Sequence, residues 1–249
     1  MNAKAEIFGH LHVPGKPLIL YNIWDAGSAA AVAKAGAKAI ATGSYGVANA
    51  HGFTDGETLP LDLVFSNLVE IAGVTELPVT IDLEAGYGDT AEAVGVTAAA
   101  SAAKGAAGCN IEDKVPGTRT LFDTADAAAR YKAAAASGLW INARADLFII
   151  TPPAEHDEGV ADALLERARA YAGAGANSLF VPFVTDRKLI GRICQRSPLP
   201  VNILMSPGTP DHKTLAELGV ARISHGHYPW AQAMADLEGY AKKIFDLFE

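Results

Sequence analysis

Short apolar stretches alternate with alanine-rich stretches along the 249 residues of the chain. The alanine-rich stretches have the spacing of helices, whereas the apolar stretches are short and rich in aliphatic residues, which favours strands. The pattern predicts eight strands with helices between them, at residues 18–23, 38–42, 78–83, 107–111, 139–144, 178–182, 200–204 and 221–225.

Glycine occurs where several predicted helices give way to the next strand. Glycine readily adopts the left-handed conformation that ends a helix, so these positions agree with the alternating pattern. At the start of another helix, Asp89 followed by Glu92 has the spacing of a capping box, and we expect Asp89 to cap that helix. The glycine junctions are Ala35-Gly36-Ala37, Lys104-Gly105-Ala106, Ala174-Gly175-Ala176 and Leu218-Gly219-Val220.

The eight strand-helix units follow one another without a Ser/Pro-rich linker or a change in composition. An open doubly wound sheet more often has five or six parallel strands, so eight units favour a closed barrel. We therefore predict a single (β/α)8 TIM barrel spanning residues 1–249. In such a barrel the active site lies at the C-terminal ends of the strands.

Composition and charge narrow the classes of function. The net charge of −8 and the pI near 5.4, without a Lys/Arg run, give no sign of nucleic-acid binding. The 2 cysteines, Cys109 and Cys194, lack the spacing of a zinc site or a disulfide framework. The chain has no apolar run near ~18 residues and no export signal, so we expect a cytoplasmic protein that does not span a membrane.

Polar residues gather at the predicted strand ends. Asp82 and Glu84 are two positions apart, so in a strand they share one face, and a divalent cation is the usual reason to tolerate two such charges. Carboxylate oxygens suit Mg²⁺, with Mn²⁺ also possible, better than Zn²⁺. The other candidates at this rim are Asn22, Trp24, Asp25, Thr42, Gly43, Ser44, Glu112, Asp113, Arg144, Asp146, Ser224 and His225.

Two strand-end residues have both a functional and a structural interpretation. Glu112 is expected beside the strand that ends in Asp82 and can complete the shell of the cation, or it can cap a helix or pair with Lys114. Arg144 ends an apolar strand and suits a bidentate clamp on a substrate carboxylate or phosphonate, or a structural pair with Asp146 or Glu112.

Residues 41–46 include several small residues, which let backbone N–H groups approach a ligand closely, and such amides can hold a developing enolate oxygen. Asp55 follows in a polar loop that can reach the cation or remain solvated. Residues 114–126 lack periodicity, and their Pro116-Gly117 pair lies next to a cationic residue, so we expect a mobile lid. His225 and His227 lack further ligands at metal spacing, so we expect them to form hydrogen bonds at the rim.

Five segments together resemble the isocitrate lyase/phosphoenolpyruvate mutase superfamily. They are residues 22–29, 42–48, 82–88, 110–114 and 143–146, and their order and spacing match across most of the chain. The acidic segment that ends in Gly86-Tyr87-Gly88, followed by Glu112-Asp113-Lys114, is the most specific part of the resemblance.

The resemblance implies a (β/α)8 barrel, often with the last helix exchanged between subunits of a homodimer or homotetramer, and Mg²⁺-dependent chemistry on 2-oxo acids or their enolates. By the same resemblance, Asp82 contacts the metal directly and Arg144 binds the acidic group of the substrate. The remaining implied roles are metal-bound water for Glu84, Glu112 and Asp55, and backbone amides toward the substrate for Ser44 and Tyr45.

Departures from the superfamily pattern, in the lid and at residue 43, narrow the reaction that we expect. Members that cleave isocitrate or methylisocitrate have a Lys-Lys/Arg-Cys-Gly-His sequence in the lid, whereas residues 116–120 here read Pro-Gly-Thr-Arg-Thr, so isocitrate-type cleavage is not expected. Members that handle phosphonates usually have an Asn-Ser pair there, which is also missing. Gly43 replaces a serine of many relatives and removes one hydroxyl contact to the substrate.

We hypothesise a Mg²⁺-dependent C–C lyase or decarboxylase that acts on a small anionic 2-oxo acid such as oxaloacetate through a metal-stabilised enolate. Asp55, Glu112, Arg144 and Arg119 are its expected catalytic residues, and Trp24 and Gly43 join the expected substrate contacts. The proton donor to the enolate stays open among Tyr45, Arg119 and His225. Two alternatives also stay open: P–C bond chemistry, with Arg119 and Arg144 neutralising a phosphoryl group, and a barrel that binds 2-oxo acids without catalysis.

Overall fold

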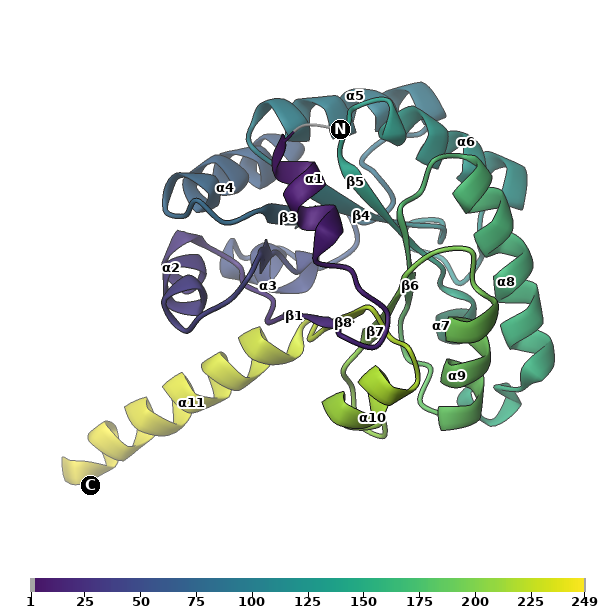
Figure 1. The fold of residues 1–249 in the computed structure, drawn as a ribbon. Helices are drawn as coiled ribbons and strands as arrows, with labels where there is room; N and C mark the ends of the chain where they lie inside the picture. Colours follow the sequence, from purple (N-terminus) through teal and green to yellow (C-terminus); the bar gives the residue numbers. More distant parts are fainter. Residues whose placement is uncertain (1–2, 249) are drawn as a thin grey trace.

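Eight parallel strands form the centre of a computed structural model that describes residues 3–248 (Figure 1). Neighbouring strands follow the order β1-β8-β7-β6-β5-β4-β3-β2, and a parallel bridge from Ile23 to Thr42 joins the segments that follow β1 and β2. The predicted (β/α)8 barrel is therefore confirmed; it is nearly closed, and all its strands except β4 are shorter than expected. The strands are β1 (Leu18–Leu20), β2 (Ile40–Ala41), β3 (Val79–Asp82), β4 (Gly108–Glu112), β5 (Trp140–Arg144), β6 (Ser178–Val181), β7 (Val201–Leu204) and β8 (Arg222–Ser224).

Helices surround the barrel and fill the connections between its strands (Figure 1). Their apolar faces pack against the outward-facing residues of the strands to form the main core. The helices are α1 (Ala3–His10), α2 (Ala26–Lys34), α3 (Ser44–Ala50), α4 (Leu61–Gly73), α5 (Ala91–Ala103), α6 (Thr124–Ala135), α7 (Leu147–Ile150), α8 (Glu158–Gly173), α9 (Arg187–Arg196), α10 (His212–Glu217), α11 (Tyr228–Phe245), and the 3₁₀ turns η1 (Pro153–Glu155) and η2 (Asp246–Phe248).

Helix α1 covers the N-terminal end of the barrel. Its buried Phe8 belongs to a small apolar cluster with Leu18, Ala39 and Ala107, which lie at or just before the starts of β1, β2 and β4. Because this end is filled by side chains, the opposite end, where the strands finish, is the one available to a ligand.

The helix-to-strand junctions follow the prediction from glycine. Gly36, Gly105, Gly175 and Gly219 all have positive φ, between 92° and 100°. The expected capping box at Asp89 is wrong by one residue. Thr90 is the N-cap of α5, because its extended backbone (φ −119°, ψ 161°) lets its hydroxyl accept a hydrogen bond from the Ala93 amide.

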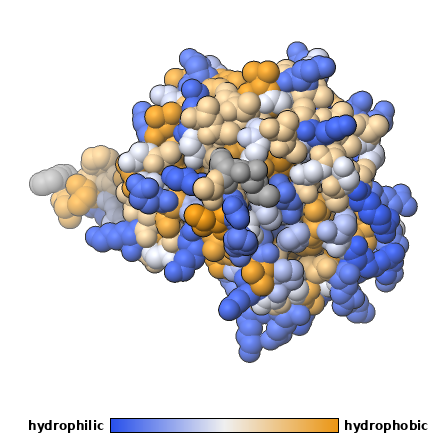
Figure 2. Space-filling view, turned by 45° about the horizontal axis from the view of Figure 1, so that its top comes forward, coloured by the Kyte–Doolittle hydropathy of each residue, from blue (hydrophilic) through white to orange (hydrophobic). Residues whose placement is uncertain are grey.

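Helix α11 extends away from the barrel (Figure 1). Large hydrophobic side chains are exposed on and just beyond it, and Figure 2 shows hydrophobic atoms near the far end of this arm. They are Leu237, Tyr240, Ile244, Phe245 and Leu247. Within residues 3–248, no helix combines the length and apolar character needed to cross a membrane.

The segment expected to be a lid begins with a tight turn after β4. Lys114 and Leu121 form an antiparallel bridge, and the Val115 amide donates a hydrogen bond to the Thr120 carbonyl at 2.9 Å. The mobility of this segment stays a prediction.

Candidate active site

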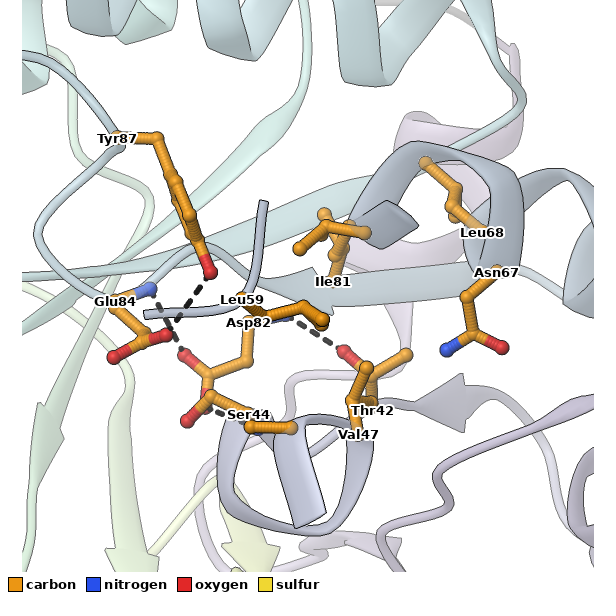
Figure 3. A pocket seen from close by; sticks show the side chains of 12 residues that line it. Thr42, Ser44, Val47, Leu59, Asn67, Leu68, Ile81, Asp82, Glu84 and Tyr87 are labelled. Carbon is orange, nitrogen blue, oxygen red and sulfur yellow. Dashed lines mark hydrogen bonds between the residues drawn. The ribbon is translucent and has the colours of Figure 1, made fainter. Parts of the chain in front are cut away.

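Asp82 is the last residue of β3, and hydrogen bonds fix it against the end of β2. Its backbone N–H donates to the Thr42 hydroxyl at 2.8 Å, and its carboxylate accepts from the Ser44 amide at 3.2 Å (Figure 3). A longer contact of 3.4 Å joins its other oxygen to the Glu84 amide. The carboxylate is thus oriented by backbone amides and has no cationic partner among the ion pairs of residues 3–248.

Glu84 lies beyond the end of β3 with a left-handed backbone, φ 50°. One oxygen of its buried carboxylate accepts from the amides of Gly56 and Glu57, each at 2.7 Å, and the other accepts from the Tyr87 hydroxyl at 3.1 Å. Burial, and next the charges of Asp55 and Asp82, raise the pKa of Glu84 to about 8. The two acids therefore do border one small pocket, as expected, although strand alternation is not the cause (Figure 3).

The loop that contains Asp55 is folded back onto the end of β3. Glu84 holds its backbone at Gly56 and Glu57, and the Glu57 carboxylate accepts from the Tyr87 amide at 2.8 Å. Burial, and next the charge of Asp82, raise the pKa of Asp55. This loop brings Asp55 to Asp82, the arrangement that sequence alone left open.

Glu112 and Arg144 form an ion pair between the ends of β4 and β5. Arg144 Nη1 lies 2.9 Å from Glu112, while its Nε and Nη2 bind both oxygens of Asp146 at 2.7 and 2.9 Å. Lys114 approaches the other Glu112 oxygen at 3.2 Å. Burial alone lowers the pKa of Arg144, but Asp146 and Glu112 outweigh burial and raise it well above its usual range.

Asp113, which the sequence placed among the rim candidates, is fully buried beneath this pair. It accepts from the Asp146 amide at 2.8 Å, from Arg167 Nε at 2.8 Å and from the Tyr171 hydroxyl at 2.5 Å. Asp113 thus braces Asp146, which in turn orients Arg144.

These strand ends border a cavity of about 190 Å³. Its lining combines the carboxylates of Asp55 and Asp82 and the guanidinium of Arg144 with apolar side chains from β6, the loop after it and the end of β7. Its lining is Asn22, Gly43, Ser44, Tyr45, Asp55, Asp82, Asn110, Arg144, Phe180, Pro182, Phe183, Leu204, Ser224, Gly226 and His227.

The structure places some, but not all, of the residues expected to contact the substrate around this cavity. Gly43, Ser44 and Tyr45 line the cavity, and Gly43 lies so close to the Gly226 carbonyl that an added Cβ would be 3.3 Å from it. Trp24 instead packs against the core beneath α4, where its carbonyl accepts from Asn67. Arg119 lies at a neighbouring cavity and donates to the Ile150 carbonyl at 3.2 Å.

Sequence reasoning missed the apolar wall of the cavity. Phe180, Pro182 and Phe183 come from β6 and its following loop, where no polar residue marks the strand end. A search for polar strand ends passes over such a segment. The only signal is its place as the sixth of eight strands, whose end must face the same cavity.

The site suits a hard divalent cation that keeps several bound waters better than a cation whose ligands are all protein side chains. Within residues 3–248, no three His, Cys, Asp or Glu side chains are already gathered as a metal site. Glu84 and Glu112 use both of their oxygens in protein contacts, whereas Asp82 has only the two longer amide contacts. Since Mg²⁺ keeps several waters and binds through one or two carboxylates, this donor set fits Mg²⁺.

The model of the phosphoenolpyruvate phosphomutase family matches residues 8–245. The chain belongs to this family. This match confirms the resemblance to the isocitrate lyase/phosphoenolpyruvate mutase superfamily. The matched residues include every residue that lines the cavity.

Three relatives show the range of proteins similar to this family member. A crystal structure from Burkholderia cenocepacia J2315, of a protein proposed to be a phosphonomutase, is 50% identical over 97% of this chain and 98% of that one, with a TM-score of 0.95. The 2-methylisocitrate lyase of Escherichia coli K12 is 30% identical over 88% of this chain and 79% of its own. An oxaloacetate decarboxylase of Bradyrhizobium sp. BTAi1 is 29% identical over 69% of this chain and 63% of its own.

Proposed function

We propose that this family member is a Mg²⁺-dependent C–C lyase or decarboxylase for a small 2-oxo acid of the oxaloacetate type. The observation that carries the proposal is the cavity itself, in which one guanidinium, Arg144, faces the carboxylates of Asp82 and Asp55. The carboxylates suit a cation that binds a 2-oxo acid, and the guanidinium suits a second acidic group.

Arg144 retains the donors that a substrate carboxylate requires. A guanidinium has five N–H groups, and Arg144 uses three of them on Asp146 and Glu112. Two therefore remain for a ligand. Because Asp146 holds the guanidinium plane from one edge and Asp113 holds Asp146, the remaining edge is fixed before a ligand arrives.

Bound Mg²⁺ would supply charge to stabilise the enolate that C–C cleavage leaves. Asp82 would hold it directly, and Glu84, Glu112 and Asp55 through water, because these are the carboxylates at the end of β3 and around it. The amides at the start of α3 have no acceptor within that helix, so the Tyr45 amide is available to the substrate, whereas Ser44 already donates to Asp82.

Cleavage of the bond to the departing carboxylate gives CO₂ and an enolate, which must then gain one proton. Among the three expected donors, Tyr45 lines the cavity. His225 instead contacts the Leu20 carbonyl, and Arg119 lies at the neighbouring cavity. We therefore assign the proton transfer to Tyr45.

Neither cysteine supports isocitrate-type acid/base chemistry. Burial raises the pKa of Cys109 and of Cys194 to about 12, and Cys194 lies on α9. The lid turn at residues 116–120 offers no thiol.

P–C bond chemistry is the second candidate, because the matching family model and the 50% identical protein both carry phosphonate-related descriptions. A phosphoryl group has more charge to neutralise than a carboxylate. Among the described residues that line the cavity, Arg144 is the one arginine or lysine, which favours the carboxylate substrate.

The proposal includes a homodimer or homotetramer in the cytoplasm. The apolar residues along α11 need a covering surface, and exchange of this helix between subunits would provide one. The two cysteines are both unpaired, which agrees with a reducing compartment.

Product analysis by NMR tests the proposal. Purified protein with Mg²⁺ is given oxaloacetate, other 2-oxo acids and phosphonopyruvate, and each reaction is repeated with Asp82→Ala, because oxaloacetate also loses CO₂ with metal alone. Pyruvate formed faster by the wild type supports the C–C lyase, a changed ³¹P signal supports P–C chemistry, and ligand binding without turnover supports a binding barrel.

A further inference from the structure

A second and larger cavity adjoins the first. Its volume is about 770 Å³, about four times that of the cavity that contains Asp82. Phe183 lines both, so the two spaces meet at this side chain. We name the smaller space, with Asp82 and Arg144, the inner chamber, and the larger one, with Arg119 and Ile149, the outer chamber.

The outer chamber has an apolar floor. Ile149 of α7, Pro153 of η1, Phe183 and Pro207 contribute the accessible hydrocarbon surface, above the buried side chains of Phe148, Val184 and Leu189. A four-carbon acid held in the inner chamber would leave this surface against water, whereas a longer hydrocarbon chain would cover it.

Arg119 is the cation of the outer chamber with unused donors. One of its five N–H groups binds the Ile150 carbonyl at 3.2 Å. The acid nearby, Asp186, caps α9 by accepting from the amides of Lys188 and Leu189 at 2.8 and 2.9 Å. Because the charge of Asp186 is engaged by a helix end, Arg119 remains available to an anion.

Phe183 marks the boundary between the chambers. Its φ of 61° is unusual for a bulky residue, and such a conformation persists only where the surrounding structure holds it. Phe183 is 39% exposed, so solvent reaches this residue where the two chambers meet.

We propose that the outer chamber binds the distal part of an extended substrate, a 2-oxo acid with an unbranched hydrocarbon chain that ends in a carboxylate. This inference rests on the proposed function, since it places the 2-oxo acid group in the inner chamber beside Asp82 and Arg144. The chain passes Phe183, lies on the apolar floor, and its terminal carboxylate binds Arg119.

Isothermal titration calorimetry with Mg²⁺ tests this inference through binding, without need of turnover. The probes are pyruvate, 2-oxooctanoate and 2-oxosuberate, which share the 2-oxo acid group and differ in chain length and terminal charge. We expect 2-oxooctanoate to bind at least tenfold tighter than pyruvate, and 2-oxosuberate tighter still.

Two variants separate the contribution of the apolar floor to binding from that of the Arg119 charge. Ile149→Trp fills the floor and should bring both long acids down to the affinity of pyruvate, whereas Arg119→Gln should bring 2-oxosuberate down to that of 2-oxooctanoate. Val96→Trp, on the exposed face of α5, is the control and should change none of the three affinities.

The inference would be overturned if the long acids bind no tighter than pyruvate. It would also be overturned if the Ile149→Trp variant still binds the long acids more tightly than pyruvate. The proposed function fails separately, if pyruvate and the long acids bind but no oxo acid is turned over. If oxaloacetate is turned over but the long acids bind no more tightly than pyruvate, the outer chamber is not a substrate site.

Discussion

The backbone amide of Ser44 donates a hydrogen bond to the carboxylate of Asp82 across 3.2 Å. This contact joins the first residue of α3, the helix that follows β2, to the last residue of β3, the strand paired with β2. It orients the Asp82 carboxylate without neutralising it, because an amide carries only a partial charge. Asp82 is therefore the group whose charge the proposed chemistry depends on most.

Replacement of Asp82 by asparagine should lower the rate of Mg²⁺-dependent turnover at least about 100-fold, while the protein still folds. The amide side chain keeps the shape and its single oxygen can still accept from the Ser44 amide, so the charge and the longer contact to the Glu84 amide are lost. Steady-state rates with Mg²⁺, alongside circular dichroism, measure the two effects. A variant with unchanged rates would show that Asp82 is not the metal ligand.

Glu84→Gln should stabilise the metal-free protein and weaken Mg²⁺ binding by about tenfold. Because the pKa of Glu84 is raised to about 8, the native protein takes up a proton at this carboxyl near neutral pH that the unfolded chain does not hold, which costs stability. Glutamine avoids this cost and can still accept from the amides of Gly56 and Glu57 through its oxygen. Thermal unfolding with EDTA and Mg²⁺ titration check the two parts. Glu92→Gln, on the first turn of α5, is the matched control and should leave Mg²⁺ affinity unchanged.

Much of this architecture can be predicted from sequence because it depends on local rules. Glycine at positions such as Gly36 ends helices, and polar residues at strand ends such as Arg144 mark the rim. Contacts between distant segments cannot be predicted in this way. Asp113 is buried because Arg167, 54 residues away, supplies its charge partner. The left-handed backbone of Glu84 likewise depends on a loop 27 and 28 residues before it.

Stability should fall as the pH drops from about 6.5 towards 3, in part because of His12. Burial, and next the charge of Arg222, lower the pKa of His12 to about 3. The unfolded chain therefore binds a proton at His12 in this range and the native protein does not, which favours unfolding by about 1.4 kcal/mol per pH unit. Chemical denaturation at several pH values measures this slope.

His12→Gln is the comparison for that measurement, because glutamine cannot take up the proton. Its stability should fall less steeply between pH 6 and 4 than that of the wild type. Equal slopes for the two proteins would mean that His12 is not the group responsible.

Tyr240→Glu combined with Phe245→Glu should convert the proposed oligomer to a monomer. Both side chains are exposed hydrophobic groups on α11, 68% and 73% exposed, and burying two carboxylates in a subunit interface is strongly unfavourable. Light scattering after size exclusion gives the mass. Lys242→Glu, which also replaces an exposed residue of α11, should leave the oligomer intact. A wild type that is already monomeric would contradict helix exchange.

The central claim is that Arg144 and the carboxylates around Asp82 form one site for a 2-oxo acid. The most direct measurement is the rate of pyruvate formation from oxaloacetate with Mg²⁺, compared between the wild type, Arg144→Gln and Arg192→Gln. Arg192 pairs with acids on the outer surface and is the control. We predict turnover by the wild type and Arg192→Gln, and a loss of at least about 100-fold in kcat/KM for Arg144→Gln. A rate that is equal in all three proteins, or no greater than that of Mg²⁺ alone, would contradict the account.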